Sequence, residues 1–181
     1  YVSVGKDVTE RLREEQSLRE SATVDQLTGL FNRNHGKALL SEAYSFTLSR
    51  EEPMSLILCD IDHFKQVNDQ YGHIIGDEVI QFVAQCLKDN VRTSDLLVRY
   101  GGDEFLVLIE NIDFDNARKI ADKIRSEVEG AYILSENGDQ IQVSVSVGVA
   151  IGAQSWISLF TKADKALFVA KGQGRNAVAE V

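Results

Sequence analysis

The chain has 181 residues, of which 44% are hydrophobic and 26% charged, a balance typical of one globular domain with room for an extension. Its net charge of −9 at pH 7 disfavours a nucleic-acid-binding surface, which usually has a basic face. A nucleotide ligand is compatible with this charge, because a few cationic side chains and metal ions can attract it locally. No apolar run approaches the roughly 18 residues of a membrane span. The chain opens at Tyr1 without a methionine, so we expect a fragment of a longer protein.

The cysteines and histidines predict neither a disulfide nor a zinc site. Cys59 lies in an apolar run and Cys86 in a helical pattern, which is typical of core thiols in a reducing compartment. The three histidines, His35, His63 and His73, lack the spacing of zinc ligands.

Residues 1–24 differ from the rest of the chain. The stretch from Lys6 to Ser21 is charged and helix-prone, with a thin apolar stripe that matches a heptad repeat poorly. We interpret it as a linker helix that either pairs weakly with its copy in a dimer or packs against its own domain, and the pattern favours neither.

Residues 25–181 form the second predicted unit, a globular domain in which helical and strand patterns alternate. The expected elements are a helix at 32–50, a strand at 54–61, a helix from about 76 to 89, a hairpin of strands 96–98 and 105–109, a helix at 114–128, a hairpin of strands 131–134 and 140–150, a helix at 156–170 and a short strand near 176–180. The order β-α-β-β-α-β is that of a ferredoxin-like, mostly antiparallel sheet with helices on one face. The predicted fold class is α+β.

The turn between strands 96–98 and 105–109 reads Gly101-Gly102-Asp103-Glu104. We expect a tight hairpin in which both glycines adopt positive φ angles, which glycine tolerates without steric cost. A hairpin tip between buried strands has no structural need for two adjacent carboxylates. Asp103 and Glu104 therefore indicate a site for metal ions and a polyanion.

A third carboxylate, Asp60, emerges where strand 54–61 leaves the core. In the expected fold this strand neighbours the hairpin, so Asp60 can lie beside Asp103 and Glu104. Such a cluster suits Mg²⁺, which binds through one or two carboxylates and substrate phosphates.

Phosphates would need separate cations, because the chain has no P-loop and no G-x-G-x-x-G after a strand. The candidates are Lys65, Lys171 and Arg175, and the alternative for each is a solvated surface charge. Asn68 and Asp77 lie between the strand and the next helix, where capping or turn roles are the ordinary interpretation.

A series of short motifs, each weak alone, follows one order along residues 25–176. They are DQLTGL at 25–30, NR at 32–33, DIDHFK at 60–65, ND at 68–69, YGH at 71–73, GD at 76–77, GGDEF at 101–105, SVG at 146–148, ADKAL at 163–167, AK at 170–171 and GRN at 174–176. Together they resemble the GGDEF family, the diguanylate cyclases that make cyclic di-GMP. The resemblance implies a sheet of the nucleotidyl cyclase and polymerase-palm type, surrounded by helices.

The resemblance also implies roles for individual residues. The metal ligands for Mg²⁺ (or Mn²⁺) would be the carboxylates of Asp60 and Asp103 and the backbone carbonyl of Ile61, and Glu104 would complete the acidic catalytic cluster. Asn68 and Asp77 resemble the residues that read guanine, because a carboxylate accepts from the adjacent N1–H and amino group. The other GTP-binding residues implied are His63, Phe64, Lys65, Lys171 and Arg175.

The implied reaction is attack of the 3′-hydroxyl of one GTP on the α-phosphate of another, with release of pyrophosphate. Each domain holds one GTP, so a two-fold homodimer is expected. Arg92 and Asp95 form an RxxD that matches the inhibitory site for cyclic di-GMP, although this pattern is commonly a surface ion pair.

The opening residues 4–11 (VGKDVTER) resemble the exit of a PAS sensor domain, which would regulate the cyclase from the same chain. The expected location is the cytoplasm, with a membrane tether of the full protein left open. Two alternatives are a catalytically silent module that binds GTP or cyclic di-GMP, and a cyclase with another nucleotide product. The intact signature favours the enzyme.

Overall fold

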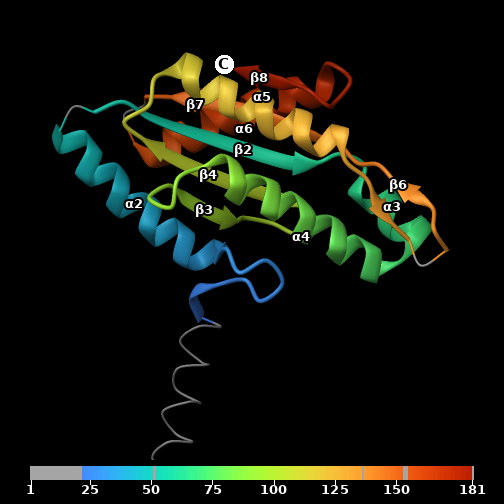
Figure 1. The fold of residues 1–181 in the computed structure, drawn as a ribbon. Coiled ribbons are helices and arrows are strands. Elements are labelled where there is room, and N and C mark those ends of the chain that lie inside the picture. Colours follow the sequence, from blue (N-terminus) through green and yellow to red (C-terminus); the bar gives the residue numbers. More distant parts are fainter. Residues whose placement is uncertain (1–21, 51, 136, 153–154, 181) are drawn as a thin grey trace, which may run out of the picture.

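The computed structural model describes residues 22–50, 52–135, 137–152 and 155–180. Its centre is a six-stranded sheet in the order β1-β3-β4-β2-β7-β8 (Figure 1). The strands are β1 (Phe31–Asn32), β2 (Met54–Ile61), β3 (Leu96–Arg99), β4 (Glu104–Glu110), β7 (Val145–Ile151) and β8 (Val178–Glu180). The inner pairs are antiparallel, whereas β1 and β8 add to the edges in parallel. The inner order β3-β4-β2-β7 confirms the predicted ferredoxin-like α+β sheet.

Strand β2 lies in the middle of the sheet and is buried along its whole length. Its side chains alternate between two cores, with Ile57 and Cys59 on one side and Leu56 and Leu58 on the other. A strand covered on both faces needs apolar residues at nearly every position, which explains its unbroken apolar run.

Helices cover both faces of the sheet, so the expectation of helices on one face is wrong. Helices α4 (His73–Asn90) and α5 (Phe114–Gly130) build one core, and Figure 1 shows them crossing the near face. Helices α2 (Arg33–Arg50) and α6 (Trp156–Gly172) build the other core. The physical cause is the two-sided apolar sheet, because each apolar face must be covered. The surrounded sheet implied by the family resemblance is therefore confirmed.

Residues 64–71 form a helix, α3 (Phe64–Tyr71), where the sequence predicts caps and turns. It begins after His63, which has a φ of 56°, and ends at Gly72, which has a φ of 86°. Only Val67 of this helix is buried, so eight residues give too little apolar periodicity to reveal it. The next helix, α4, begins at His73 rather than at about residue 76.

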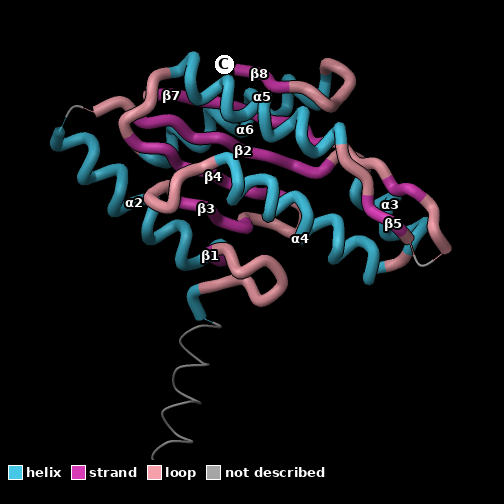
Figure 2. The backbone as a smooth tube through the Cα atoms, in the orientation of Figure 1, coloured by secondary structure: helices cyan, strands magenta, loops and turns pink. Residues whose placement is uncertain are grey.

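The predicted strand 140–150 is split into two. Residues Gln140–Ile141 form β6, which pairs with β5 (Ile133–Leu134) in a small hairpin set apart from the main sheet, near α3 (Figure 2). Main-sheet pairing starts where Val145 faces Ile61, because β2 ends there.

The linker helix and the sensor-domain exit fall almost wholly on residues 1–21, which lie outside the described part of the chain. Among the residues that the structure describes, no helix is long and apolar enough to cross a membrane.

Candidate active site

Asp60 lies at the end of β2, at the centre of the candidate site. Its register partners are Glu104 of β4 and Ser146 of β7. The residue is 7% exposed, and its Oδ1 lies 2.8 Å from Lys171 Nζ of α6. Burial raises the pKa of Asp60 to about 6, against the opposing effect of Lys171 and with the help of the charges on Asp103 and Glu104. A carboxylate whose charged form is this costly gains from a bound cation.

The Gly101–Glu104 segment joins β3 to β4 beside Asp60. The Gly101 amide donates to the Glu104 carbonyl at 3.1 Å, and the Ile61 amide donates to the Asp103 carbonyl at 3.1 Å. Neither glycine has a positive φ, so that expectation is wrong. A Cβ on Gly101 would lie 2.5 Å from Glu104 Oε2, the far end of a flexible side chain that would have to shift. A Cβ on Gly102 would meet nothing, so this part of the turn is open to a ligand.

Arg99, which the sequence analysis did not single out, ties this turn to the start of the domain. Its Nε and Nη2 donate to the Gly102 carbonyl at 3.2 and 2.7 Å, and its Nη1 donates to both oxygens of Asp25 at 3.0 and 3.1 Å. Burial pushes the pKa of Asp25 upward, but hydrogen bonds from Thr28 and Arg99 together hold it below its usual value. The first motif of the chain and the signature turn are therefore one connected network.

The donor set at this site is that of a hard, hydrated cation. Asp60 and the Asp103–Glu104 pair bring carboxylates from two neighbouring strands to one edge of the sheet. Among the described residues, no three His, Cys, Asp or Glu side chains converge into a complete metal cage. Carboxylates are the ligand type that Mg²⁺ prefers in proteins, where one or two of them are commonly joined by water and substrate phosphates.

The packing of α3 on α4 buries an amide oxygen. Asn68 of α3 lies against Gly76 of α4, where an added Cβ would collide with Asn68 Oδ1 and lie 3.3 Å from Phe64 Cζ. Asn68 Oδ1 is buried and accepts no hydrogen bond from the described residues. The next residue along α4, Asp77, is exposed. The Asp77 carboxylate is thus open to a ligand that carries N–H donors, whereas Asn68 Oδ1 is an unpaired acceptor enclosed between the two helices.

The predicted cations do not all lie in the same environment. Lys171 forms an ion pair with Asp60. Lys65 and His63, at the start of α3, are exposed. Arg175 is exposed just beyond α6 and has a φ of 65°. The structure brings one of the predicted cations to Asp60 and leaves the other three side chains exposed to solvent.

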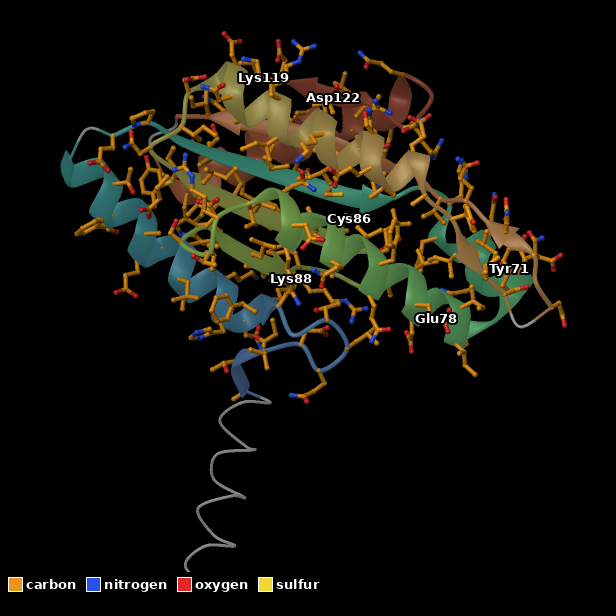
Figure 3. All side chains as sticks on the ribbon, viewed as in Figure 1. Tyr71, Glu78, Cys86, Lys88, Lys119 and Asp122 are labelled. Atoms are coloured by element: carbon orange, nitrogen blue, oxygen red, sulfur yellow. The ribbon has the colours of Figure 1, made fainter. Side chains whose placement is uncertain are left out.

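Arg92 and Asp95 lie in the turn between α4 and β3. The Arg92 amide donates to Asp95 Oδ2 at 2.7 Å, and the Asp95 amide donates to the Arg92 carbonyl at 3.0 Å. The turn borders a groove of about 340 Å³ that Gly29 and Lys88 also line. Lys88 extends from α4 toward the 25–30 loop (Figure 3), where its Nζ donates to the Thr28 carbonyl at 2.7 Å.

Comparisons with known proteins identify relatives of this chain. The family model described as "Diguanylate cyclase, GGDEF domain" matches residues 22–177. Diguanylate cyclase DosC of Escherichia coli (strain K12) is 37% identical over 166 residues, which are 91% of this chain and 36% of DosC. Response regulator PleD of Caulobacter vibrioides (strain NA1000 / CB15N) is 39% identical over 163 residues, which are 88% of this chain and 36% of PleD. The chain thus spans about a third of the length of these curated relatives.

Solved structures share the fold. The crystal structure of the coiled coil and GGDEF domain of DgcB from Caulobacter crescentus, in complex with c-di-GMP, superposes with a TM-score of 0.90 at 31% identity. The match covers 98% of this chain and 95% of that one. Motifs, sheet order and family model agree, and the chain belongs to the GGDEF-domain family of diguanylate cyclases.

Proposed function

We propose that this chain is the output domain of a diguanylate cyclase, which condenses two GTP molecules into cyclic di-GMP and releases pyrophosphate. The observation that carries the proposal is the position of Asp60 beside an intact Gly101–Glu104 turn. Relatives named diguanylate cyclase support the same chemistry.

Diguanylate cyclases of the GGDEF family use divalent metal ions. In this chain we assign the ligands of Mg²⁺ or Mn²⁺ to the carboxylates of Asp60 and Asp103 and the carbonyl of Ile61. When bound, the ion lowers the pKa of the attacking 3′-hydroxyl and neutralises charge on the phosphoryl oxygens. Glu104 adds negative charge beside Asp60, and Lys171 holds one oxygen of Asp60 in place.

Asn68 and Asp77 would select guanine. The buried Asn68 Oδ1 lacks a donor among the described residues, and the exposed Asp77 carboxylate can accept from N1–H and the amino group of guanine. Adenine presents an acceptor in place of N1–H, which leaves that carboxylate unpaired and repelled. Phe64 packs beside Asn68 at Gly76 and contributes a wall of the same site.

The triphosphate would lie against Lys65, Lys171 and Arg175, with His63 at the start of α3 nearby. Arginine offers a forked donor that suits phosphate oxygens. Each domain binds one GTP, so catalysis would need a second copy of the domain facing the first about a two-fold axis. A sensor in the same polypeptide would control that approach.

The test of this function is incubation of the protein, alone and as a forced-dimer fusion, with Mg²⁺ and either GTP or ATP. We expect mass spectrometry to detect cyclic di-GMP from GTP, and no product from ATP. Asp103→Ala is expected to abolish the product. Absence of product from the forced dimer would support the silent-module alternative, and full turnover by Asp103→Ala would refute the metal assignment.

Product inhibition through the Arg92 turn gives a second prediction. Arg92→Ala is expected to raise the cyclic di-GMP concentration that halves the rate about tenfold or more, because a charge-assisted contact to the product is lost. Initial rates measured with added product provide the readout. Arg118, an exposed arginine of α5, is the matched control, and its alanine variant should keep the wild-type inhibition curve. Unchanged inhibition in Arg92→Ala would exclude this turn as the inhibitory site.

A further inference from the structure

The segment that joins α6 to β8 has an unusual backbone. Arg175 and Asn176 adopt φ angles of 65° and 46°, in the left-handed region, which asparagine tolerates but which a residue such as arginine rarely occupies. Such backbone strain persists only where surrounding contacts enforce it, and it concentrates at functional sites. The contacts that hold this turn therefore indicate which residues fix the position of Arg175.

Asp62 supplies the first of these contacts. It is 4% exposed, and its Oδ2 accepts from the Asn176 amide at 2.9 Å and from Ser144 Oγ at 2.7 Å. Its Oδ1 accepts from Ser146 Oγ at 2.6 Å. Both oxygens of this buried carboxylate are thus engaged by neutral donors, and one of these donors is the backbone of the strained turn.

The Asn176 side chain supplies the second set of contacts. Its Oδ1 accepts from Arg125 Nη1 of α5 at 3.0 Å, and its Nδ2 donates to Glu129 Oε1 at 2.6 Å. Arg125 and Glu129 are themselves paired at 2.7 Å. The residue after Arg175 is therefore held by the end of β2 on one side and by α5 on the other.

We propose that Asp62 is a positioning residue that fixes the turn carrying Arg175 and so sets this cation for the triphosphate. The inference rests on the proposed function, in which Arg175 binds phosphate. Two aspartates at the end of β2 hold the two ends of the segment 171–176, which carries Lys171 and Arg175. Asp60 pairs with Lys171 at its start, and Asp62 accepts from the Asn176 amide at its end. Asp62 is poorly suited to bind metal directly, because a cation would have to displace hydrogen bonds from both of its oxygens.

The test is a double-mutant cycle on nucleotide binding. The probe is α,β-methylene-GTP, which keeps three phosphates but cannot release pyrophosphate, and its affinity is measured by calorimetry with Mg²⁺. Asp62→Ala and Arg175→Ala are each expected to weaken binding about tenfold, as expected for loss of a charge-assisted phosphate contact. The double variant should bind no more weakly than either single one, because both remove the same contact. Affinity for GMP, which lacks two phosphates, should stay near wild type.

Ser146→Ala is the matched control, because it removes the hydroxyl on Oδ1 and leaves the Asn176 contact intact. Its affinity for the analogue should stay near wild type. If Asp62→Ala fails to fold, the isosteric Asp62→Asn takes its place in the cycle. We expect Asp62→Asn to weaken binding of the analogue by a smaller factor, and to cause no further weakening when Arg175 is already alanine.

Two results would overturn the inference: losses that multiply in the double variant, or an equal loss for GMP and for the triphosphate analogue. Wild-type protein that binds the analogue but makes no cyclic di-GMP from GTP would refute the proposed function alone. Wild-type protein that does not bind the analogue would refute both.

Discussion

An Asp60→Asn variant is expected to lose turnover and, in the absence of metal, to gain stability. Asparagine removes a hard anionic ligand from the proposed metal site, and we expect kcat to fall by about 10²–10³-fold, the size typical for loss of one electrostatic stabiliser of a transition state. Formation of cyclic di-GMP at saturating GTP and Mg²⁺ measures this loss.

The gain in stability follows from the pKa of Asp60. Burial, aided by Asp103 and Glu104, raises this pKa from 3.8 to about 6 in the folded protein. Between these two pH values the folded state holds a proton that the unfolded chain has lost, so stability falls as the pH rises through that window. Above pH 6 the full cost is present, at most about 3 kcal/mol, and a neutral asparagine avoids it.

Calorimetric melting in a chelator at pH 7.5 and at pH 4.5 separates the two effects. The Tm of Asp60→Asn should exceed that of the wild type by a few degrees at pH 7.5, and the difference should shrink toward pH 4. Asp139→Asn, at an exposed carboxylate just before β6, should change neither turnover nor Tm. Wild-type turnover in Asp60→Asn would remove Asp60 from the active site, and a lowered Tm at pH 7.5 would mean that its ion pair with Lys171 outweighs its burial.

The sheet could be predicted from the sequence because its strongest patterns are local and long. The run at residues 54–61 is strand β2 to the residue, and the apolar spacing at 114–128 marks α5. The signature turn and the strand end at Asp60 lie side by side, as the β-α-β-β order predicts. Local periodicity, turn chemistry and connectivity agree in this region, so the sequence is compatible with few alternative strand arrangements.

The predictions that were wrong concern features that long-range packing determines. Nothing local distinguishes a sheet covered on one face from a sheet covered on both, and α3 buries only Val67. The break in strand 140–150 depends on where β2 ends, at Ile61, and not on the alternating valines themselves. The Gly101-Gly102 turn has no positive φ at either glycine, because the backbone conformation of this turn is set by its contacts in the fold and not by the residue pair alone.

The supporting contacts of the site were also hidden from the sequence. Arg99 meets Asp25 across 74 positions, and Asp62 meets Asn176 across 114 positions. No spacing rule joins residues so distant. Arg99 and Asp62 are charged side chains at the ends of buried strands, which is a weak signal that each needs a partner. Family motifs identify the groups proposed to touch GTP, whereas the groups that position them emerge only from the fold.

The largest effect on stability is expected from Gly148→Ala. Gly148 lies in β7, between Leu58 of β2 and Ala179 of β8, and α6 crosses directly over it. A Cβ at this position would collide with the backbone of α6 at the Ala163 carbonyl and the Leu167 amide. A helix backbone cannot rotate away as a side chain can, so we expect a loss of about 3 kcal/mol in the free energy of unfolding.

Displacement of α6 should reach the active site as well, because this helix carries Lys171 to Asp60. We therefore expect the denaturation midpoint and the rate of cyclic di-GMP formation to fall together in Gly148→Ala. Gly130→Ala is the control: its added Cβ, at the end of α5, would meet nothing, its φ is not positive, and its stability should match or slightly exceed wild type. A Gly148→Ala protein as stable as wild type would show that α6 can move away from β7 at little cost. If that protein also kept its activity, the ion pair between Lys171 and Asp60 would not depend on this close contact.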